Sequence, residues 1–419
     1  MEHPIFPLMT PLRQHFDRKA LQDIPAEIRS GLETLKDSIK PGARVGITVG
    51  SRGINNILVI LETIIDYIRE CGASPVLLAA MGSHGGGTQA GQEETLRSLG
   101  ITEERLGAAI ITCVEGREAA VTSGGWKVYM LESAYTVDAL LSVNRIKTHT
   151  SFKGTVESGP VKMLVVGLGG PPGAAQFHSV GNAALLAPLL EEVGEAILES
   201  MPVIGGVAVI ENAYEETAAI EVIAPKRLIA RERELLLYSK SLMPALPVDR
   251  LDGLVVGEMG KNFSGTGLDT NIIGRLRIQG REEPLSPQIK YVSVLDLSEA
   301  SHGNATGIGL ADFATQKLVD KIDRKATYLN NMTTTFVIRA FLPLYFDTDQ
   351  ECLGAMMHCL RNTPPKDLRL VFIANTLHLA KCWVSQALLP ELEDKGRFEI
   401  LGPARQVAFD SNGNLDLPL

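Results

Sequence analysis

Three loops of the chain carry side chains that could take part in acid–base chemistry, and each follows a run of residues typical of a buried β-strand. They are Gly-Ser-Arg-Gly at residues 50–53, Gly-Ser-His-Gly-Gly-Gly at 82–87 and Lys-Thr-His at 147–149. Imidazole titrates near neutral pH and can both accept and donate a proton. In open α/β sheets, ligands bind outside the carboxyl ends of the strands. We therefore expect Arg52, His84 and His149 to converge on one crevice.

A fourth segment, Ser-Gly-Pro-Val-Lys at residues 158–162, places Lys162 among glycine, proline and apolar residues. Partial burial lowers the pKa of a lysine, and this makes the neutral amine available as a nucleophile. The alternative is a lysine whose methylene stem carries the ammonium to the surface. The sequence alone leaves both interpretations open.

The elements that position these loops alternate between short β-rich runs and amphipathic helices, which is typical of mainly parallel sheets with helices on both faces. In the first half we expect strands at residues 44–49, 75–80, 108–114, 137–143 and 207–210, and helices at 54–68, 92–99 and 226–241. In the second half we expect strands at 254–257, 289–297 and 368–373, and a helix at 310–322.

The domain organisation follows from a proline pair, Pro244 and Pro247, which marks a candidate linker. A chain of 419 residues that is 45% hydrophobic can fill the cores of two domains of ordinary size. We expect two α/β domains, each a mainly parallel sheet flanked by helices, with the active site in the cleft between them. The first spans residues 1–245, with 403–419 as a segment that could complete it, and the second spans 250–402.

Composition excludes several classes of protein. The net charge of −9 would repel nucleic acid and anionic membrane surfaces, so neither is an expected partner. Glu2 and His3 stand where an export signal would be basic and apolar, and no apolar run reaches the roughly 20 residues that span a bilayer. Five scattered cysteines without a CxxC pair indicate neither a disulfide framework nor a zinc knuckle. We expect a cytoplasmic protein.

Taken in order, these motifs resemble the N-terminal domain of nickel-dependent lactate racemases. The resemblance rests on a strand-end arginine, a strand-end Gly-Ser-His, a second strand-end histidine, an SGxxK segment and a histidine sixteen positions after its lysine, and it covers residues 10–210. It implies that Lys162 holds covalently a nickel pincer nucleotide, pyridinium-3-thioamide-5-thiocarboxylic acid mononucleotide with Ni(II). It also implies that His178 is the protein ligand of the nickel ion.

The same resemblance implies roles for the strand-end loops. His84 and His149 correspond to two acid/base histidines on opposite sides of the substrate, and Arg52 to an arginine of the cofactor and substrate pocket. Ser51, Ser158 and Gly159 are assigned to the cofactor site with them. The implied activity is a racemase or epimerase of a small 2-hydroxy acid, and the implied partners are that substrate and the proteins that make the cofactor.

The chemistry explains why two histidines would be needed. The hydrogen on the carbinol carbon of a 2-hydroxy acid is hardly acidic, so direct deprotonation is unfavourable. A hydride route avoids the carbanion, because one histidine takes the hydroxyl proton while hydride leaves to the cofactor. The planar 2-keto acid can receive hydride on either face, and each enantiomer presents its hydroxyl to a different histidine.

Several positions depart from the family's pattern. Val49 replaces a frequent aspartate, Gly85 replaces an arginine, and the second half lacks the usual tyrosine–glutamine, so we expect a substrate other than lactate. Lys261 could supply the carboxylate contact instead. Two other classes remain open: a non-catalytic carrier of the nickel cofactor, and an NAD-linked oxidoreductase, although no GxGxxG follows a strand. His358 and His378 stand among apolar residues and are expected in the core.

Overall fold

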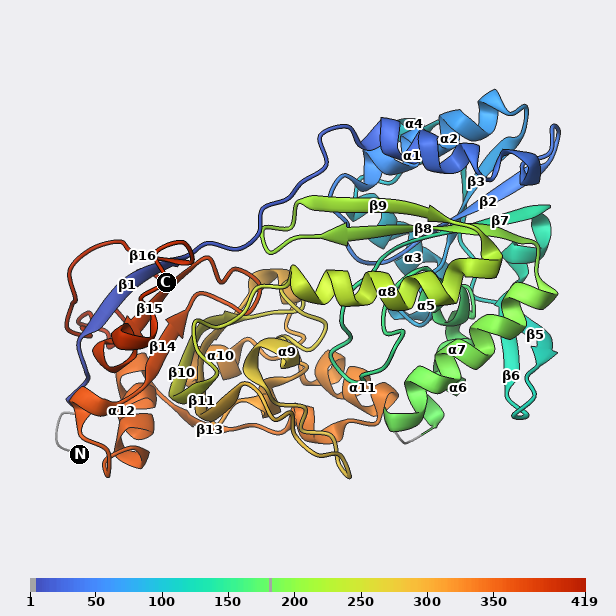
Figure 1. Cartoon of the computed structure of the whole chain (residues 1–419). Helices are drawn as coiled ribbons and strands as arrows, with labels where there is room; N and C mark the ends of the chain where they lie inside the picture. Colours follow the sequence, from blue (N-terminus) through green and yellow to red (C-terminus); the bar gives the residue numbers. More distant parts are fainter. Residues whose placement is uncertain (1–4, 181–182) are drawn as a thin grey trace. The chain divides into compact units, whose positions relative to one another are not determined.

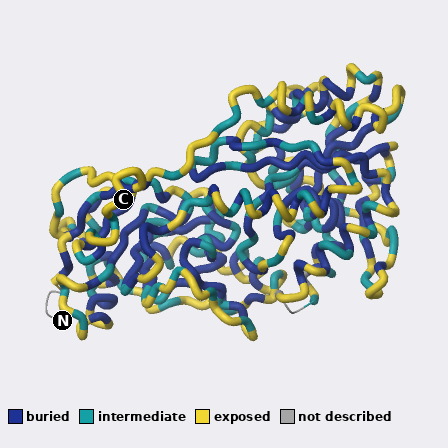
Figure 2. Tube along the Cα trace, in the orientation of Figure 1, coloured by how far each residue is buried: buried dark blue, intermediate teal, exposed yellow. Residues whose placement is uncertain are grey.

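The computed structural model describes residues 5–180 and 183–419, without the side chains of His178 and Ala183. The chain divides into two compact units. The N-terminal unit is Arg18–Met243, and the C-terminal unit is Pro244–Leu419 together with the chain up to Asp17. Figure 2 shows that the buried segments follow the strands of both units. Within the described residues, no helix is both long and apolar enough to cross a membrane.

The N-terminal unit is built on a six-stranded sheet in the order β4-β3-β2-β7-β8-β9. All neighbouring strands are parallel except β8 and β9, which pair antiparallel. The strands are β2 (Arg44–Val49), β3 (Ser74–Ala79), β4 (Ala109–Ile111), β7 (Ala139–Arg145), β8 (Val203–Glu211) and β9 (Thr217–Ile223). A separate hairpin joins β5 (Gly116–Val121) to β6 (Lys127–Leu131).

Helices cover both faces of this sheet (Figure 1). On one face lie α1 (Ile24–Glu33), α2 (Ile57–Glu70) and α4 (Glu103–Leu106), and on the other α5 (Pro160–Lys162), α7 (Ala183–Ser200) and α8 (Leu228–Ser241). The remaining helices are α3 (Gln89–Ser98) and α6 (Gly170–Ser179). Apolar residues of α2 recur at helical spacing, so Ile60, Ile64 and Ile68 point to one side and are fully buried in the core with Ile47 of β2.

The C-terminal unit holds an eight-stranded sheet in the order β13-β12-β11-β10-β14-β15-β1-β16. Strands β13 to β14 in that order are parallel, and β15, β1 and β16 are antiparallel to their neighbours. The strands are β1 (Met9–Gln14), β10 (Arg250–Met259), β11 (Gln288–Leu297), β12 (Phe313–Thr315), β13 (Leu344–Phe346), β14 (Leu370–Ile373), β15 (Lys381–Ser385) and β16 (Phe398–Ile400). The helices are α9 (Thr270–Ile273), α10 (Gln316–Asp320), α11 (Arg324–Thr334) and α12 (Asp349–Cys359).

The expected fold class, two α/β domains with mainly parallel sheets flanked by helices, is confirmed. The expected boundaries differ from the observed ones at both ends of the chain. Met9 and Leu12 of β1 are fully buried in the C-terminal unit, where β1 lies between β15 and β16. Residues 403–419 also belong to this unit, since Trp383 Nε1 donates to the carbonyl of Pro418.

One expected element is wrong. Residues 310–322 were expected to form a helix, but Phe313–Thr315 is the short strand β12 and only Gln316–Asp320 is helical. Phe313 and Ala314 pair with β11 on one side and β13 on the other. This pairing buries a short apolar run. The spacing of apolar residues in a run of this length does not distinguish a strand from a helix.

Candidate functional site

The carboxyl ends of three adjacent parallel strands bring the sequence-predicted loops to one edge of the N-terminal sheet. Strand β2 lies between β3 and β7, and both pairings are parallel. Arg52 follows β2, His84 follows β3 and His149 follows β7. Because all three strands point the same way, these loops leave the sheet at the same edge.

The β2 and β3 loops contact one another through Ser51 and His84. The Ser51 hydroxyl shares a hydrogen bond with Nδ1 of the exposed His84 ring. Behind the histidine, the N–H of Gly82 donates to the carbonyl of Gly167 over 3.1 Å. Gly82 has a φ of +57°, and a Cβ at this position would come within 3.0 Å of the Val166 carbonyl oxygen. Glycine therefore lets the His84 loop rest on the turn that follows Lys162.

The ring of His149 is held on two sides by its own loop. It stacks on Phe152 with ring centroids 4.2 Å apart, and its Nδ1 accepts a hydrogen bond from the backbone N–H of Ser151 over 3.1 Å. An acceptor nitrogen carries no proton, so this bond places the proton of the neutral ring on Nε2. The neutral His149 ring thus presents an Nε2–H donor.

A buried carboxylate, Glu157, organises the same loop, although no sequence motif pointed to it. Its side chain is fully buried and accepts the backbone N–H of His149 over 2.7 Å and that of Gly154 over 3.4 Å. Lys240 of α8 lies 2.8 Å from one carboxylate oxygen, and Lys153 lies 3.7 Å from the other. Buried charges are retained where they are paired and hydrogen-bonded. Glu157 is therefore a positioning residue for His149.

The segment 158–162 is held against β7 and the loop that follows it by three hydrogen bonds. The N–H of Lys147 donates to the Ser158 carbonyl over 3.0 Å, Asn144 Nδ2 to the Gly159 carbonyl over 2.9 Å, and Ser142 Oγ to the Pro160 carbonyl over 2.8 Å. Residues 160–162 then form the single helical turn α5, which continues into a π-helical turn at Met163–Gly167. Lys162 is thereby fixed beside the loop that ends β7.

A second buried acid, Glu232 of α8, lies on the other side of this turn. Its Oε2 accepts the backbone N–H of Val161 over 2.9 Å, and its Oε1 has no hydrogen-bond partner among the described residues. Burial raises the pKa of Glu232 to about 8, although the Val161 bond opposes this shift. The carboxyl group therefore holds a proton over most of the neutral range. Glu232 was not expected at the site, because an acid in a charged helix has the sequence pattern of a solvent-facing residue.

The Lys162 side chain combines partial exposure with a lowered pKa. Burial of the amine, followed by the positive charges of Lys147 and Arg52, lowers its pKa to about 8. An ammonium group surrounded by other cations and deprived of water loses its proton more readily. A substantial fraction of Lys162 is therefore neutral amine near pH 8, and this is the form that acts as a nucleophile.

Arg52 belongs to the same group of cations. Part of its side chain is exposed, but burial of the guanidinium from water lowers its pKa. The positive charge of Arg145 lowers this pKa further. Arg145 is itself paired with Glu211, whose other oxygen accepts the backbone N–H of Asn55 over 2.8 Å. Glu211 thus offsets part of the Arg145 charge. Arg52, Lys147 and Lys162 together give the edge a positive field that suits an anionic ligand.

The remaining predicted site residues are spread over the two units. Ser158 is half-buried next to Gly159. The backbone of His178 lies in α6, but its side chain is outside the described part of the structure. Lys261 belongs to the C-terminal unit, where its Nζ donates to the Gly265 carbonyl over 2.6 Å and to Asn330 Oδ1 over 2.8 Å. Among the described side chains, no group of three or more His, Cys, Asp or Glu residues is placed to hold a metal ion.

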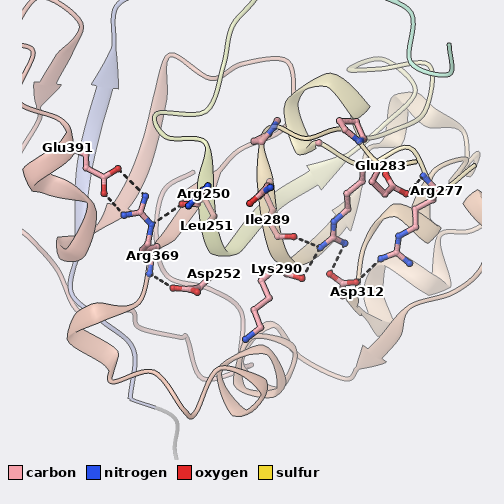
Figure 3. A pocket seen from close by; sticks show the side chains of 15 residues that line it. Arg250, Leu251, Asp252, Arg277, Glu283, Ile289, Lys290, Asp312, Arg369 and Glu391 are labelled. Atoms are coloured by element: carbon pink, nitrogen blue, oxygen red, sulfur yellow. Dashed lines mark hydrogen bonds and ion pairs between the residues drawn. The ribbon is translucent and has the colours of Figure 1, made fainter. Parts of the chain in front are cut away.

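The C-terminal unit also has an open groove of about 940 Å³ at the amino ends of β10, β11 and β14. Figure 3 shows Arg277 turned toward Asp312 and Arg369 turned toward Glu391, whereas the Lys290 side chain points away from both pairs. Arg277 lies 3.0 Å from Asp312, which also binds Arg275, and Arg369 pairs with Glu391. Asp312 and Arg369 stand just before β12 and β14, so these pairs tie the starts of two strands to the segments beside them.

Comparisons with known proteins agree with this architecture. The chain is similar to a solved structure titled "Structure of the lactate racemase apoprotein from Thermoanaerobacterium thermosaccharolyticum", with a TM-score of 0.50 and 12% identity over 81% of this chain and 85% of that chain. The fold is lactate racemase-like. Residues 47–232 match a family model described as "Domain of unknown function (DUF362)". This match lies within the N-terminal unit of the lactate racemase-like fold. A comparison with curated proteins gives no match.

Proposed function

We propose that the protein is a racemase or epimerase that inverts the stereocentre of a small 2-hydroxy acid by hydride transfer. The observation that carries the proposal is the pKa of Lys162, lowered to about 8, at the sheet edge from which the loops of His84 and His149 also leave. A poised amine and two imidazoles on neighbouring strand ends supply a covalent attachment point and two proton carriers. The lactate racemase-like fold supports this combination.

The residues present suit a nickel pincer nucleotide. The neutral amine of Lys162 would form the covalent link, and the charges of Lys147 and Arg52 would attract the nucleotide phosphate. Ser51, Ser158 and Gly159 would complete the cofactor site, with His178 of α6 as the ligand of Ni(II). When bound, this cofactor supplies the hydride acceptor and donor that inversion through a planar 2-keto acid requires.

The chain's own groups would orient the substrate and move its hydroxyl proton. Arg52 would bind the carboxylate, and Lys261 remains a predicted second contact. His84, bonded to Ser51, would serve one enantiomer, and His149 would serve the other. In its protonated form, His149 would return a proton to the hydroxyl oxygen. Glu157 and Phe152 would keep this ring in place while its charge changes.

The proposal is tested by producing the protein in a host that makes the cofactor. Intact mass and nickel content are measured together, and single enantiomers of several 2-hydroxy acids are then assayed by chiral chromatography. We expect a mass increase that Lys162→Ala abolishes and that Lys226→Ala, a control at an exposed lysine of the same unit, retains.

Two outcomes would replace the proposal. A stable adduct without inversion of any 2-hydroxy acid, unaffected by His84→Ala or His149→Ala, would indicate a carrier of the cofactor. Absence of the adduct combined with substrate-dependent reduction of NAD would indicate an oxidoreductase.

A further inference from the structure

An apolar surface, formed by residues 328–345 of the C-terminal unit, is not used by the proposed function. It contains eight large apolar side chains that are 45–65% exposed: Tyr328, Leu329, Met332, Val337, Phe341, Leu342, Leu344 and Tyr345. They extend from α11 through a short 3₁₀ turn to β13. Single exposed apolar residues are ordinary, but a run of this size on a monomer's surface marks an interaction site.

The charge of this segment is as unusual as its hydrophobicity. Residues 326–346 contain one charged side chain, Arg339, whereas 21% of the whole chain is charged. Arg339 is 2% exposed, and its Nε donates to the Leu276 carbonyl over 2.8 Å. The exposed part of the segment therefore carries no charge at all.

The segment also borders an edge of the sheet. Strand β13 is the outermost strand of the eight-stranded sheet, beside β12. Proteins commonly protect such edges with charged side chains, bulges or proline. Here Pro343 precedes the strand and the exposed Asp347 follows it, while the three residues of the strand itself carry no charge.

We propose that this surface binds a second copy of the chain and forms a symmetric dimer. A two-fold interface sets each patch against itself, so a charge near the axis would meet its own copy. An uncharged patch avoids this repulsion, and homodimer interfaces are richer in apolar surface than transient ones. At roughly 100 Å² each, eight half-exposed side chains offer on the order of 800 Å², which is about what each partner contributes to a stable interface.

The form of the contact follows from Pro343 and from the length of β13. Proline offers no N–H, and the strand has only three residues, so a continuous sheet across the dimer would gain few hydrogen bonds. The apolar side chains must therefore carry the contact. Phe341 and Leu344 are the most exposed of the eight, at 61% and 65%, and we expect them to lie at its centre.

The test is the oligomeric state of the full chain, measured by size-exclusion chromatography with light scattering between 1 and 100 µM protein. We expect a dimer for the natural chain. Phe341→Asp should weaken association on the order of 100-fold, because each copy would bury an unpaired carboxylate. Leu285→Asp is the matched control, since Leu285 is 88% exposed in the same unit but lies outside the patch. Both variants should keep the thermal unfolding midpoint of the monomer.

A monomeric natural chain at 100 µM would overturn the proposal. Hydrogen exchange then identifies the alternative, because slow exchange at residues 328–345 in a monomer would mean that the chain covers its own patch. Loss of the dimer in Leu285→Asp as well as Phe341→Asp would also exclude this surface as the specific contact. Both results are independent of catalysis, so the outcome leaves the proposed function untouched.

Discussion

Gly159 and Glu232 lie so close together that a Cβ atom at position 159 would come within 2.4 Å of the Glu232 Oε1 oxygen. The backbone of Gly159 has extended geometry, with φ near 180°, so the glycine is required by space and not by conformation. The same carboxyl group accepts the N–H of Val161. Glu232 of α8 therefore packs closely against the turn that carries Lys162.

Gly159→Ala should disturb that fit. The added methyl must displace either the Glu232 carboxyl or the α5 turn, and we expect a loss of about 1–3 kcal/mol in the free energy of unfolding. Urea unfolding measures it. Gly53→Ala is the control, because a Cβ there meets nothing closer than 3.9 Å. Equal free energies of unfolding for the two variants would show that the turn can accommodate a methyl group at position 159.

The raised pKa of Glu232 predicts a pH dependence of stability. The folded chain holds a proton on Glu232 up to about pH 8, whereas an ordinary glutamate loses it near 4.5. Between these values the folded state binds more protons than the unfolded state, so this group's contribution to stability falls as pH rises from 4.5 to 8. We therefore compare the free energy of unfolding of Glu232→Gln with that of the natural chain. The difference in favour of the variant should be larger at pH 9 than at pH 6, by on the order of a few kcal/mol. Urea unfolding of both proteins at both pH values measures this difference. An equal difference at pH 6 and pH 9 would contradict the prediction.

The amine of Lys162 should react as a base of pKa near 8. The cofactor-free chain is acetylated over a range of pH, and the rate at Lys162 is followed by peptide mass spectrometry. The midpoint of the pH dependence of this rate should lie well below the pKa of 10.5 of an ordinary lysine. Arg52→Gln removes one of the positive charges that lower this pKa, so the midpoint should move upward. A midpoint that stays in place in Arg52→Gln would assign the lowered pKa to burial and to Lys147.

The two histidines should be needed together for inversion. Each turnover takes a proton on one side of the substrate and returns it on the other, so either alanine variant should lose inversion by on the order of 10²- to 10⁴-fold. The variant that keeps the correct base should still pass hydride to the cofactor from one enantiomer, and this half-reaction is followed as an absorbance change. Near-normal racemisation by both His84→Ala and His149→Ala would exclude these residues as the acid/base pair.

Glu157 should act through His149. Glu157→Gln removes the charge that pairs with Lys240 but keeps an acceptor for the His149 N–H, so we expect kcat to fall more than KM rises. The pH profile of kcat should shift as well, because the carboxylate no longer favours the protonated imidazole. Glu191→Gln, at a less buried carboxylate paired with Arg233, is the control. Identical pH profiles for the natural chain and Glu157→Gln would reduce Glu157 to a structural role.

The strand-end loops could be predicted from sequence because their signals are local. A buried strand such as residues 44–49 is followed at once by Gly50-Ser51-Arg52, and parallel strands place their carboxyl ends together. Side chains whose importance comes from tertiary burial left no such signal. In the sequence, Glu157 and Glu232 look like solvent-facing acids. In the structure both are buried, because α8 packs over Glu157 and directs its own Glu232 inward.

The converse error affected two histidines. His358 and His378 stand among apolar residues and were expected in the core, but both are exposed. His358 lies on the outer side of α12, whose buried face includes Cys352 and Met356. His378 lies in a loop after β14, where its N–H donates to Asn375 over 2.8 Å. Neighbouring apolar residues in sequence therefore say little about a residue on a helix or in a turn, where adjacent side chains point in different directions.

The place of β1 sets an order on biosynthesis. Residues 9–14 leave the ribosome long before their partners on both sides, Lys381–Ser385 and Phe398–Ile400, are made. At ordinary translation rates the first strand waits on the order of 20–70 s for its neighbours. The whole N-terminal unit, Arg18–Met243, is complete within that interval and can fold before the sheet that encloses β1 exists. A nascent chain stalled after residues up to Met243 have emerged should therefore already protect the Lys162 turn from proteases, while residues 5–17 remain open to cleavage.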